Sequence, residues 1–394
     1  MPPKKTRLKP KFSLSWSTES GRGFYYQVIA VLILALVAWY LWSNTSRNLT
    51  MMQIRTGFGF LSQSAGFDIG ESLFAFAPSD SYLRAFAVGL GNTLRVSVAG
   101  IILATILGTL VGIGRLSKNF LLRKLCDGYV ETMRNIPLLI QLLAWYLVIT
   151  QLLPSSHEAI QPLPHVYLSK SGLQLPVPVW SLGWYLSIAG LIAGPVCAWL
   201  LYKAARRRQN LTGAAPRVLY PALIIIAALP VAGWLLGGAP TGFDIPEATV
   251  FSISGGAALT PEFLALLMGL TISTASYIAE IVRAGIQAVA HGQAEACSSL
   301  GLSRAQALRL VILPQAMRVI VPPLTSQYLN LTKNSSLAVT VGYPDIVSIA
   351  NTSLNQNGQA LECISVIMLV YLTISLIIAA FMNWYNRHMA LVER

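Results

Sequence analysis

The chain has 394 residues, of which 54% are hydrophobic and only 11% are charged, and its mean hydropathy is +0.59. Soluble domains usually carry about 25% charged residues, so this composition excludes an ordinary soluble protein and predicts a chain that lies mainly in lipid. In a soluble protein the formal charge of +13 would suggest nucleic-acid binding. Here most of the cations lie in short segments between apolar runs, which indicates membrane topology and argues against a nucleic-acid partner.

The first apolar run, 24–42, is long enough to cross a membrane, because about 20 residues span the hydrocarbon core. A basic segment precedes it, but no small-x-small cleavage site follows closely, so we expect a retained helix rather than a signal peptide. Seven further spans are predicted at 83–113, 125–153, 179–202, 218–236, 261–289, 316–340 and 361–386. Eight crossings of an all-α polytopic membrane protein place both termini in the cytoplasm.

The loops alternate in charge along the chain, as the positive-inside rule requires. The cations of the predicted cytoplasmic segments include Lys4, Lys5, Arg7, Lys9, Lys11, Arg22, Arg115, Lys118, Arg123, Lys124, Lys203, Arg206, Arg207, Arg208, Arg217, Arg387 and Arg394. The predicted external segments carry Asp68, Glu71, Asp80, Asp244 and Glu247 with few cations. Two of these segments, 154–178 and 237–260, contain Pro and Gly, and the fold of a third, 44–82, is not readable from its sequence.

Two patterns predict local geometry within the spans. Gly108 and Gly112 form a GxxxG step, which permits close contact between helices. Pro322 and Pro323 should bend or break the span 316–340. Breaks at membrane depth persist only where protein or a water-filled cavity surrounds them.

The segment from Gln293 to Pro314 is a polar helix-turn-helix between two apolar spans. Gly301 suits a left-handed cap at the end of the first helix. Ser303 opens the second helix with Gln306 in capping-box spacing, and Pro314 is expected to close it. In a chain without a large soluble domain, this loop predicts a docking surface for a partner.

The same segment resembles the EAA loop of ABC importer permeases, in which a Glu-Ala-Ala triplet precedes a Gly and a distant Ile-x-Leu-Pro. The matching positions are Glu295, Ala296, Cys297, Gly301, Ile312, Leu313 and Pro314, with Cys as the third residue of the triplet. Four other segments resemble the polar amino-acid branch of that family: 82–95, 131–141 with its Arg-x-x-Pro-x-x-x-Gln pattern, 277–287, and 331–337 with Lys-x-Ser-Ser-Leu.

The resemblance implies a type I ABC importer permease bundle with about eight transmembrane helices. An added first helix and an inserted pair near 179–236 resemble the larger permeases of general L-amino-acid uptake systems of Gram-negative bacteria. The implied organisation is 1–43, a basic tail with the extra helix; 44–82, an external segment; 83–153, the first part of the core; 154–260, an insertion; 261–386, the second part with the coupling loop 291–315; and 387–394, a cytoplasmic tail.

The resemblance also implies the partners of the chain, in a bacterial inner membrane. The sequence contains no G-x-x-x-x-G-K-[ST] phosphate loop, so ATP and Mg are expected on a separate ATPase dimer and no cofactor on this chain. A periplasmic amino-acid-binding protein would deliver the substrate. Two permeases engage two ATPases in this family, and a homologous second permease is favoured over a homodimer.

Candidate functional residues follow from the motifs. We expect ATPase coupling at Glu295, Ala296, Gly301, Leu302 and Pro314. An ionised group at the bilayer centre costs about 2.5–3.5 kcal/mol, so intramembrane charges normally face a cavity or a partner. Substrate-path candidates are Arg95, which has no identifiable partner in the sequence, Glu131, Arg134, Asn135, Lys333, Asn334, Ser335 and Ser336.

Each candidate has an alternative structural role. Glu131 and Arg134, like Glu280 and Arg283, stand one helical turn apart and can pair internally, which we favour for the second pair. The first pair is more open, because Pro137 is expected in the same helix. For residues 333–336, a polar cavity lining and interhelical hydrogen bonds both remain open.

Two other functional classes would have different sequence features. A gradient-driven secondary transporter would show inverted repeats or acidic residues deep in spans, and only Glu131 fits that description. The sequence contains no recognisable catalytic constellation or metal-ligand spacing, so an enzyme is not expected.

Overall fold

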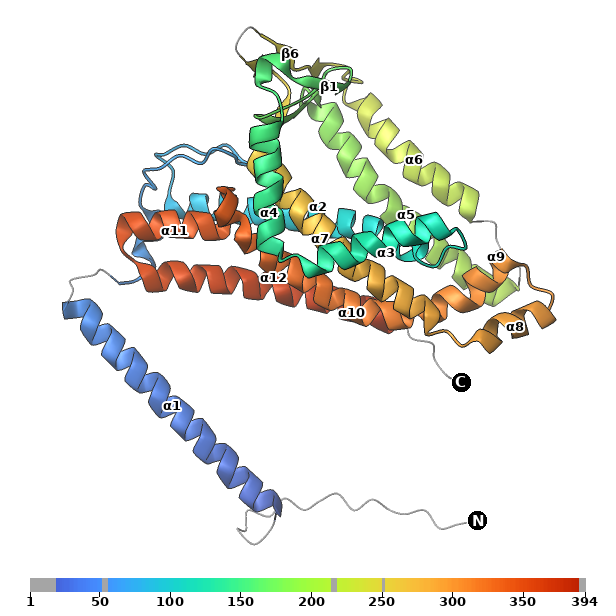
Figure 1. Ribbon diagram of the computed structural model, residues 1–394, viewed down its shortest axis with the longest axis horizontal. Helices are drawn as coiled ribbons and strands as arrows, with labels where there is room; N and C mark the ends of the chain where they lie inside the picture. Colours follow the sequence, from blue (N-terminus) through green and yellow to red (C-terminus); the bar gives the residue numbers. More distant parts are fainter. Residues whose placement is uncertain (1–18, 52–55, 214–217, 250–251, 390–394) are drawn as a thin grey trace.

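A computed structural model describes residues 19–51, 56–213, 218–249 and 252–389 (Figure 1). The basic positions 4–11, Arg217 and Arg394 therefore lie outside the described residues. The helices are α1 (Glu19–Met51), α2 (Tyr82–Gly114), α3 (Phe120–Asn135), α4 (Leu138–Leu147), α5 (Leu182–Thr212), α6 (Leu219–Leu236), α7 (Pro261–Gln287), α8 (His291–Ser299), α9 (Arg304–Ala307), α10 (Leu313–Asn334), α11 (Ile346–Asn357) and α12 (Ala360–Met389). Within the described ranges seven helices are long and apolar enough to cross a membrane, or eight if the bent pair α3–α4 is one span, in agreement with the predicted eight crossings.

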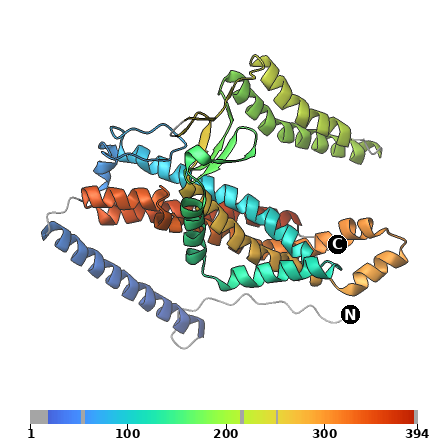
Figure 2. The ribbon, with the colours of Figure 1, turned by 45° about the horizontal axis from the view of Figure 1, so that its top comes forward.

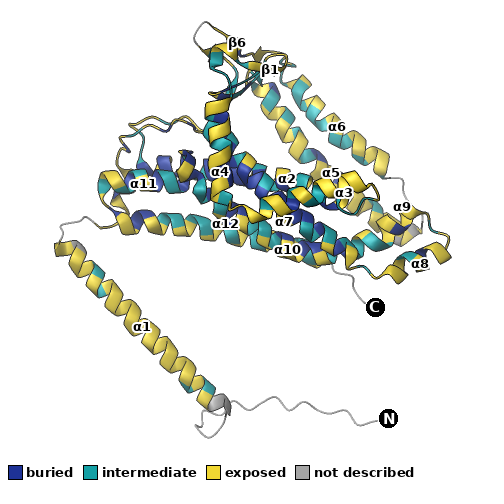
Figure 3. Ribbon diagram, viewed as in Figure 1, coloured by how far each residue is buried: buried dark blue, intermediate teal, exposed yellow. Residues whose placement is uncertain are grey.

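The centre of the bundle is α7, which lies between α2, α4 and α10 (Figures 1 and 2). Its side chains Leu266, Leu270 and Ile278 are fully buried, whereas α1 and much of α5 are exposed to the surroundings (Figure 3). The helices α2 and α7 approach closely at the GxxxG step. A Cβ atom on Gly108 would lie 2.7 Å from Ile278 Cβ, which confirms the predicted contact.

The predicted span 125–153 is not a single helix. Its two parts, α3 and α4, are bent by 104°, because Ile136 is extended before Pro137 and the position before a proline disfavours helical backbone. The Gln141 side chain provides hydrogen bonds to carbonyl groups at this break: its Nε2 donates to the carbonyl oxygens of Met133 and Ile136, at 2.9 Å each. The expectation that Pro137 lies inside the helix of Glu131 is therefore wrong.

Two proline predictions also differ from the structure. The helix α10 continues through Pro322 and Pro323 and ends only at Asn334, so of the expected bend or break the break does not occur. Pro314 does not close a helix, because it lies in the first turn of α10, where its missing N–H costs little. A π-helical turn, η4 (Leu308–Ile312), joins α9 to α10.

The two predicted external loops 154–178 and 237–260 fold together into a small β cap. Its antiparallel four-stranded sheet has the order β1-β2-β3-β8, with β1 (Ile160–Leu163), β2 (Val166–Ser169), β3 (Gly172–Leu175) and β8 (Ala257–Leu259). Two further pairs are β4 (Val177–Pro178) with β5 (Phe243–Asp244) and β6 (Glu247–Ala248) with β7 (Ile253–Ser254). These strands add a short β layer to the helical fold, and β8 leads directly into α7.

The helices α5 and α6 form a hairpin that extends from the β cap and packs chiefly on itself (Figures 1 and 2). Its contact surface is built from glycines. A Cβ atom on Gly190 would lie 2.5 Å from the Leu229 carbonyl oxygen, and one on Gly233 would lie 2.4 Å from that of Leu186. Small residues let backbones approach closely in lipid, where the apolar surroundings provide no hydrophobic drive for association.

The external segment 56–81 packs against the outer end of the bundle. A short 3₁₀ turn, η1 (Phe58–Ser62), places Phe60 against Tyr82 and Phe86, and all three rings are buried. The Gly57 N–H donates to Glu362 Oε1 at 2.6 Å, which ties this segment to the first turn of α12.

Candidate coupling segment and polar sites

The helix α8 ends in a Schellman motif at Gly301. This residue has φ +70°, as predicted for a left-handed cap. The Leu302 N–H donates to the Cys297 carbonyl oxygen at 3.1 Å, and the Gly301 N–H donates to that of Ser298 at 3.0 Å. These two bonds satisfy carbonyls that a helix end leaves open and fix the direction in which the chain leaves α8.

The second helix begins with the predicted capping box. The Gln306 N–H donates to Ser303 Oγ at 3.3 Å, and the Ser303 N–H donates to Gln306 Oε1 at 2.9 Å. At the base of the loop, Gln315 Nε2 donates to Gln293 Oε1 at 3.1 Å. Local capping at the turn and one contact at the base therefore hold the segment 291–315 as a protruding helical pair (Figure 1).

The two faces of this pair differ in burial. Cys297 and Ala307 are buried between the helices, whereas Ala296 and Glu295 are exposed, and 72% of the Glu295 side chain is accessible. Leu300 at the tip is 78% exposed. An apolar side chain this exposed at the end of a polar helix is suited to a groove on a partner.

Sequence reasoning missed Leu300, although its position directly before the cap glycine marks it as the tip of the loop. Leu302 and Pro314, which the sequence singled out, are half-buried. They therefore contribute more to the shape of the segment than to its outer surface.

A network of ion pairs joins the helices at the cytoplasmic end of the bundle. Arg115 Nε donates to Asp127 Oδ1 at 2.7 Å, and the same guanidinium pairs with Glu280. Glu280 also pairs with Arg283, as expected for residues one turn apart, with Nε to Oε2 at 3.2 Å. Because these side chains come from the C-cap of α2, from α3 and from α7, the network ties all three helices close to the point where α7 leads into α8.

Arg95 lies at the opposite end of the bundle, and it does have a partner. Its guanidinium pairs with Glu71 of the external segment and stacks over the Phe263 ring, 4.2 Å from the ring centre. Glu71 also accepts a hydrogen bond from Thr260 Oγ1, the residue that caps α7. This contact was not predictable from the sequence, because Glu71 lies in a segment without a readable fold.

The polar side chains at the end of α3 are exposed. Glu131, Arg134 and Asn135 lie on its outer surface, and the Arg134 guanidinium lies 5.4 Å from the ring centre of Tyr277. Among the described residues no ion pair joins Glu131 to Arg134, unlike Glu280 and Arg283. Charges within a membrane span normally face a partner or a cavity.

The polar cluster 333–336 marks the end of α10 and the start of the 3₁₀ segment η5 (Ser335–Val341). Ser335 is buried, and its Oγ donates to the Thr332 carbonyl oxygen at 2.7 Å; Ser336 Oγ donates to that of Lys333 at 2.8 Å. Lys333 is exposed in the last helical turn, where a cation interacts favourably with the helix dipole. The structure thus gives both serines local hydrogen bonds and leaves Lys333 directed outward.

Comparison with known proteins identifies relatives over almost the whole chain. The chain is 44% identical over 391 residues to the "General L-amino acid transport system permease protein AapQ" of Rhizobium johnstonii, covering 98% of both chains. It is 45% identical to the "Putative amino-acid ABC transporter permease protein YhdX" of Escherichia coli K12, covering 98% of this chain and 99% of that one. It is 42% identical to the "Glutamate/glutamine/aspartate/asparagine transport system permease protein BztB" of Rhodobacter capsulatus, covering 93% of each.

A family model agrees with these relatives. Residues 98–391 match the model described as "Binding-protein-dependent transport system inner membrane component". The match includes the GxxxG contact, the coupling segment and the β cap. The chain therefore belongs to this family: it is a multi-pass inner-membrane permease subunit of an ABC importer, not an enzyme, and its partners are an ATPase and a periplasmic binding protein.

Proposed function

We propose that this chain is a permease for L-amino acids and passes them from a periplasmic binding protein to the cytoplasm by alternating access. The substrate class is supported by three relatives that are all named for amino-acid transport. The match to this chain covers more than nine-tenths of the length of each of them. Polar amino acids, or a broad set, are the proposed cargo. ATP and Mg are bound by the ATPase and not by this chain.

The coupling segment 291–315 is the proposed docking site for that ATPase. Glu295, Ala296 and the tip Leu300 form the exposed face of α8, and Gly301 fixes its direction. The partner's groove would bind the apolar tip, and the capped turn would stay folded while the ATPase moves α8. The ion-pair network centred on Glu280 then passes the movement from α7 to α2 and α3.

A second, homologous permease is the proposed partner within the membrane. Glu131, Arg134 and Asn135 are exposed on the surface of α3, and α4 exposes Ile140 beside them. A charge that faces hydrocarbon costs several kcal/mol, so a facing protein surface favours this arrangement. The β cap and the α5–α6 hairpin give this chain a larger outline than the minimal bundle, which supports a heterodimer with a different permease.

The substrate path is proposed to run along this interface. Glu131, Arg134 and Asn135 would line it near the α3–α4 bend, with Lys333, Asn334, Ser335 and Ser336 at the end of α10. Arg95 is proposed to act at the external end, where its pair with Glu71 closes the route. An amino-acid substrate carries an ammonium and a carboxylate, and these exposed cations and anions offer complementary charges.

Uptake by the reconstituted complex tests the proposal. The two permeases, the ATPase and the binding protein are incorporated into liposomes with ATP inside, and the entry of radiolabelled glutamate, glutamine, arginine and leucine is measured. We expect ATP-dependent uptake of at least one of them, which Glu295→Lys reduces at least tenfold without loss of insertion. Uptake that follows an ion gradient and needs no ATP would overturn the proposal in favour of a secondary transporter.

A further inference from the structure

The α5–α6 hairpin has a wedge-shaped opening at its cytoplasmic end. Toward the β cap the two backbones are in contact: a Cβ atom on Gly183 would lie 3.0 Å from the Gly237 carbonyl oxygen, and one on Gly194 would lie 3.1 Å from Ile226 Cα. Beyond Gly194 the helix α5 contains no further glycine, and a pocket of about 390 Å³ lies between the two helices.

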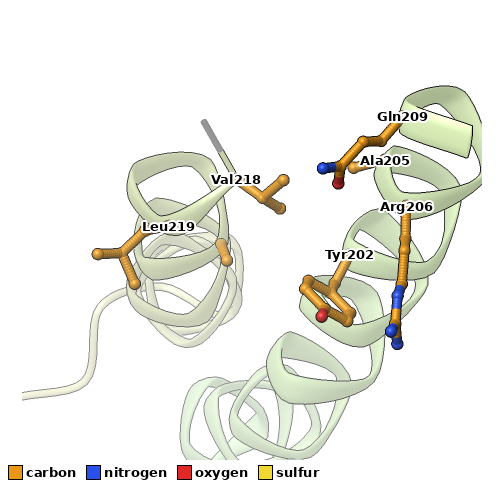
Figure 4. Close-up of a pocket in the computed structure, with 7 residues that line it drawn as sticks. Tyr202, Ala205, Arg206, Gln209, Val218 and Leu219 are labelled. Atoms are coloured by element: carbon orange, nitrogen blue, oxygen red, sulfur yellow. The ribbon is translucent and has the colours of Figure 1, made fainter. Parts of the chain in front are cut away.

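The pocket has an apolar wall and a polar rim (Figure 4). Ala205, Val218, Leu219 and Ala222 provide the apolar surface, and Tyr202, Arg206 and Gln209 provide the polar groups. Tyr202 and Gln209 project from α5 into the space that faces Val218, and Arg206 extends beside Tyr202 (Figure 4). Such a lining suits an amphiphile, with its chains against the helices and its polar head at the rim.

The charge around the pocket is positive. Lys203, Arg206, Arg207 and Arg208 lie within six residues, and the sequence contains no Asp or Glu from 159 to 243. Among the described residues, no carboxylate forms an ion pair with Lys203, Arg206 or Arg207. An anion from outside the chain is therefore the natural counter-charge of this rim.

The positive-inside rule places the pocket near the cytoplasmic membrane surface, because the basic segment 203–208 lies beside it. The Lys203 ammonium lies 5.0 Å from the ring centre of Trp199, and Trp199, Tyr202 and Tyr220 are all more than half exposed. Trp and Tyr side chains gather at the boundary between hydrocarbon and head groups. At this depth, on the cytoplasmic side, the available anions with apolar chains are the anionic phospholipids.

We propose that the wedge between α5 and α6 binds one anionic phospholipid, with its phosphate at Arg206 and its acyl chains along the apolar wall. The lipid fills the space that the glycine contacts leave open and holds the cytoplasmic ends of the hairpin at a fixed separation. This site is separate from the proposed substrate path and from the coupling segment.

Lipid titration of the purified transport complex tests the site. Dioleoylphosphatidylglycerol or dioleoylphosphatidylcholine, which differ only in the head group, is added in detergent, and native mass spectrometry counts the lipids retained on the complex. We expect one tightly held phosphatidylglycerol for each copy of this chain, and no comparable retention of phosphatidylcholine.

Three substitutions, one of them a control, localise the binding. Arg206→Gln removes the cation of the rim and should weaken phosphatidylglycerol binding about tenfold. Arg207→Gln is the matched control, because it makes the same charge change one residue away and does not line the pocket. Ala222→Phe fills the wedge without a charge change and should also prevent binding.

Three results would overturn the proposal. Equal losses in the two arginine variants would indicate general attraction between a basic surface and anionic lipid. Equal retention of phosphatidylcholine would remove the role of the anionic head group. Undiminished phosphatidylglycerol binding in the Ala222→Phe variant would place the lipid elsewhere on the chain.

Discussion

The cap residue of the coupling helix offers a sharp test, because its substitution affects the backbone alone. Gly301 has φ +70°, and a Cβ atom built on it would meet no other atom within 4 Å. Gly301→Ala therefore creates no clash, and its cost is the strain of an L-residue in the left-handed region, about 1–2 kcal/mol. The chain relieves this strain by unwinding the turn, which breaks the two bonds of the Schellman motif.

The expected consequence follows from how weakly α8 is held. A helix of nine residues is marginal by itself, and here its buried contacts centre on Cys297 and Ala307. A loss of 1–2 kcal/mol reduces the ratio of folded to unfolded turn by a factor of about 5–30. Coupling should fall accordingly, while the membrane bundle remains intact.

Gly292→Ala is the matched control. Gly292 lies in the first turn of α8, its added Cβ would also meet nothing within 4 Å, and its φ is not positive. Alanine favours helix there by up to about 1 kcal/mol, so the same substitution nine positions earlier should maintain or strengthen coupling. The two variants add the same methyl group and have opposite expected effects.

The assay is ATP hydrolysis by the reconstituted complex, stimulated by the loaded binding protein, with uptake measured in parallel. The expected order is Gly292→Ala at or above wild type, then Gly301→Asn, Gly301→Ala and Gly301→Val, because Asn tolerates positive φ and β-branched Val does not. Full coupling in the Gly301→Val variant, or equal losses in the two alanine variants, would refute the reasoning.

Three further predictions concern the bundle. Gly108→Leu should prevent the α2–α7 contact at Ile278, with a cost of about 1–3 kcal/mol or more, and a thermal unfolding midpoint in detergent equal to that of wild type would contradict it. Glu280→Gln should lower the free energy of unfolding by about 1–2 kcal/mol, since it leaves the Arg115 guanidinium with one carboxylate partner. A double-mutant cycle with Arg115→Gln should give a coupling energy between the two residues, and additive losses would exclude the network. Burial raises the pKa of the Asp345 carboxyl to about 7. The folded state therefore binds this proton more tightly than the unfolded chain does, and the free energy of unfolding falls by up to about 4 kcal/mol as the pH rises from about 4 to 7. Asp345→Asn should therefore show a smaller decline in unfolding midpoint between pH 5 and pH 8 than wild type, and identical declines would contradict the assignment.

The sequence predicted most of the helical architecture, because hydrophobic length and loop charge report directly on the bilayer. The number of crossings, the close contact at Gly108 and both caps of the coupling segment, at Gly301 and Ser303, were all predictable. Each of these features depends on residues close together in the chain or on a general property of membranes.

The proline positions were predicted less well, since a proline has different effects in different surroundings. At Pro137 the helix is interrupted, and Gln141 stabilises the bend by donating hydrogen bonds to the carbonyls that it exposes. At Pro322 the helix continues, as membrane helices often do when neighbouring helices surround them. The spacing of Pro137 and Gln141 in the sequence was the available signal for the break.

Contacts between distant segments were the least predictable part. The pair of Arg95 with Glu71 and the pair of Arg115 with Glu280 join residues on different elements. No periodicity encodes them, because they depend on how the helices are arranged. The β cap was missed for the same reason: β3 pairs with β8 across the whole α5–α6 hairpin.

The central claim is that this chain moves its substrate only through an ATPase docked on 291–315. The most direct test is affinity purification of the tagged chain from native membranes in mild detergent, with every co-purifying protein identified by mass spectrometry. The account predicts recovery of an ATPase with a phosphate-loop sequence together with a second permease, and loss of the ATPase from a Leu300→Asp variant that is still inserted. Recovery of the chain without an ATPase, in a form that still transports amino acids along an ion gradient, would contradict it.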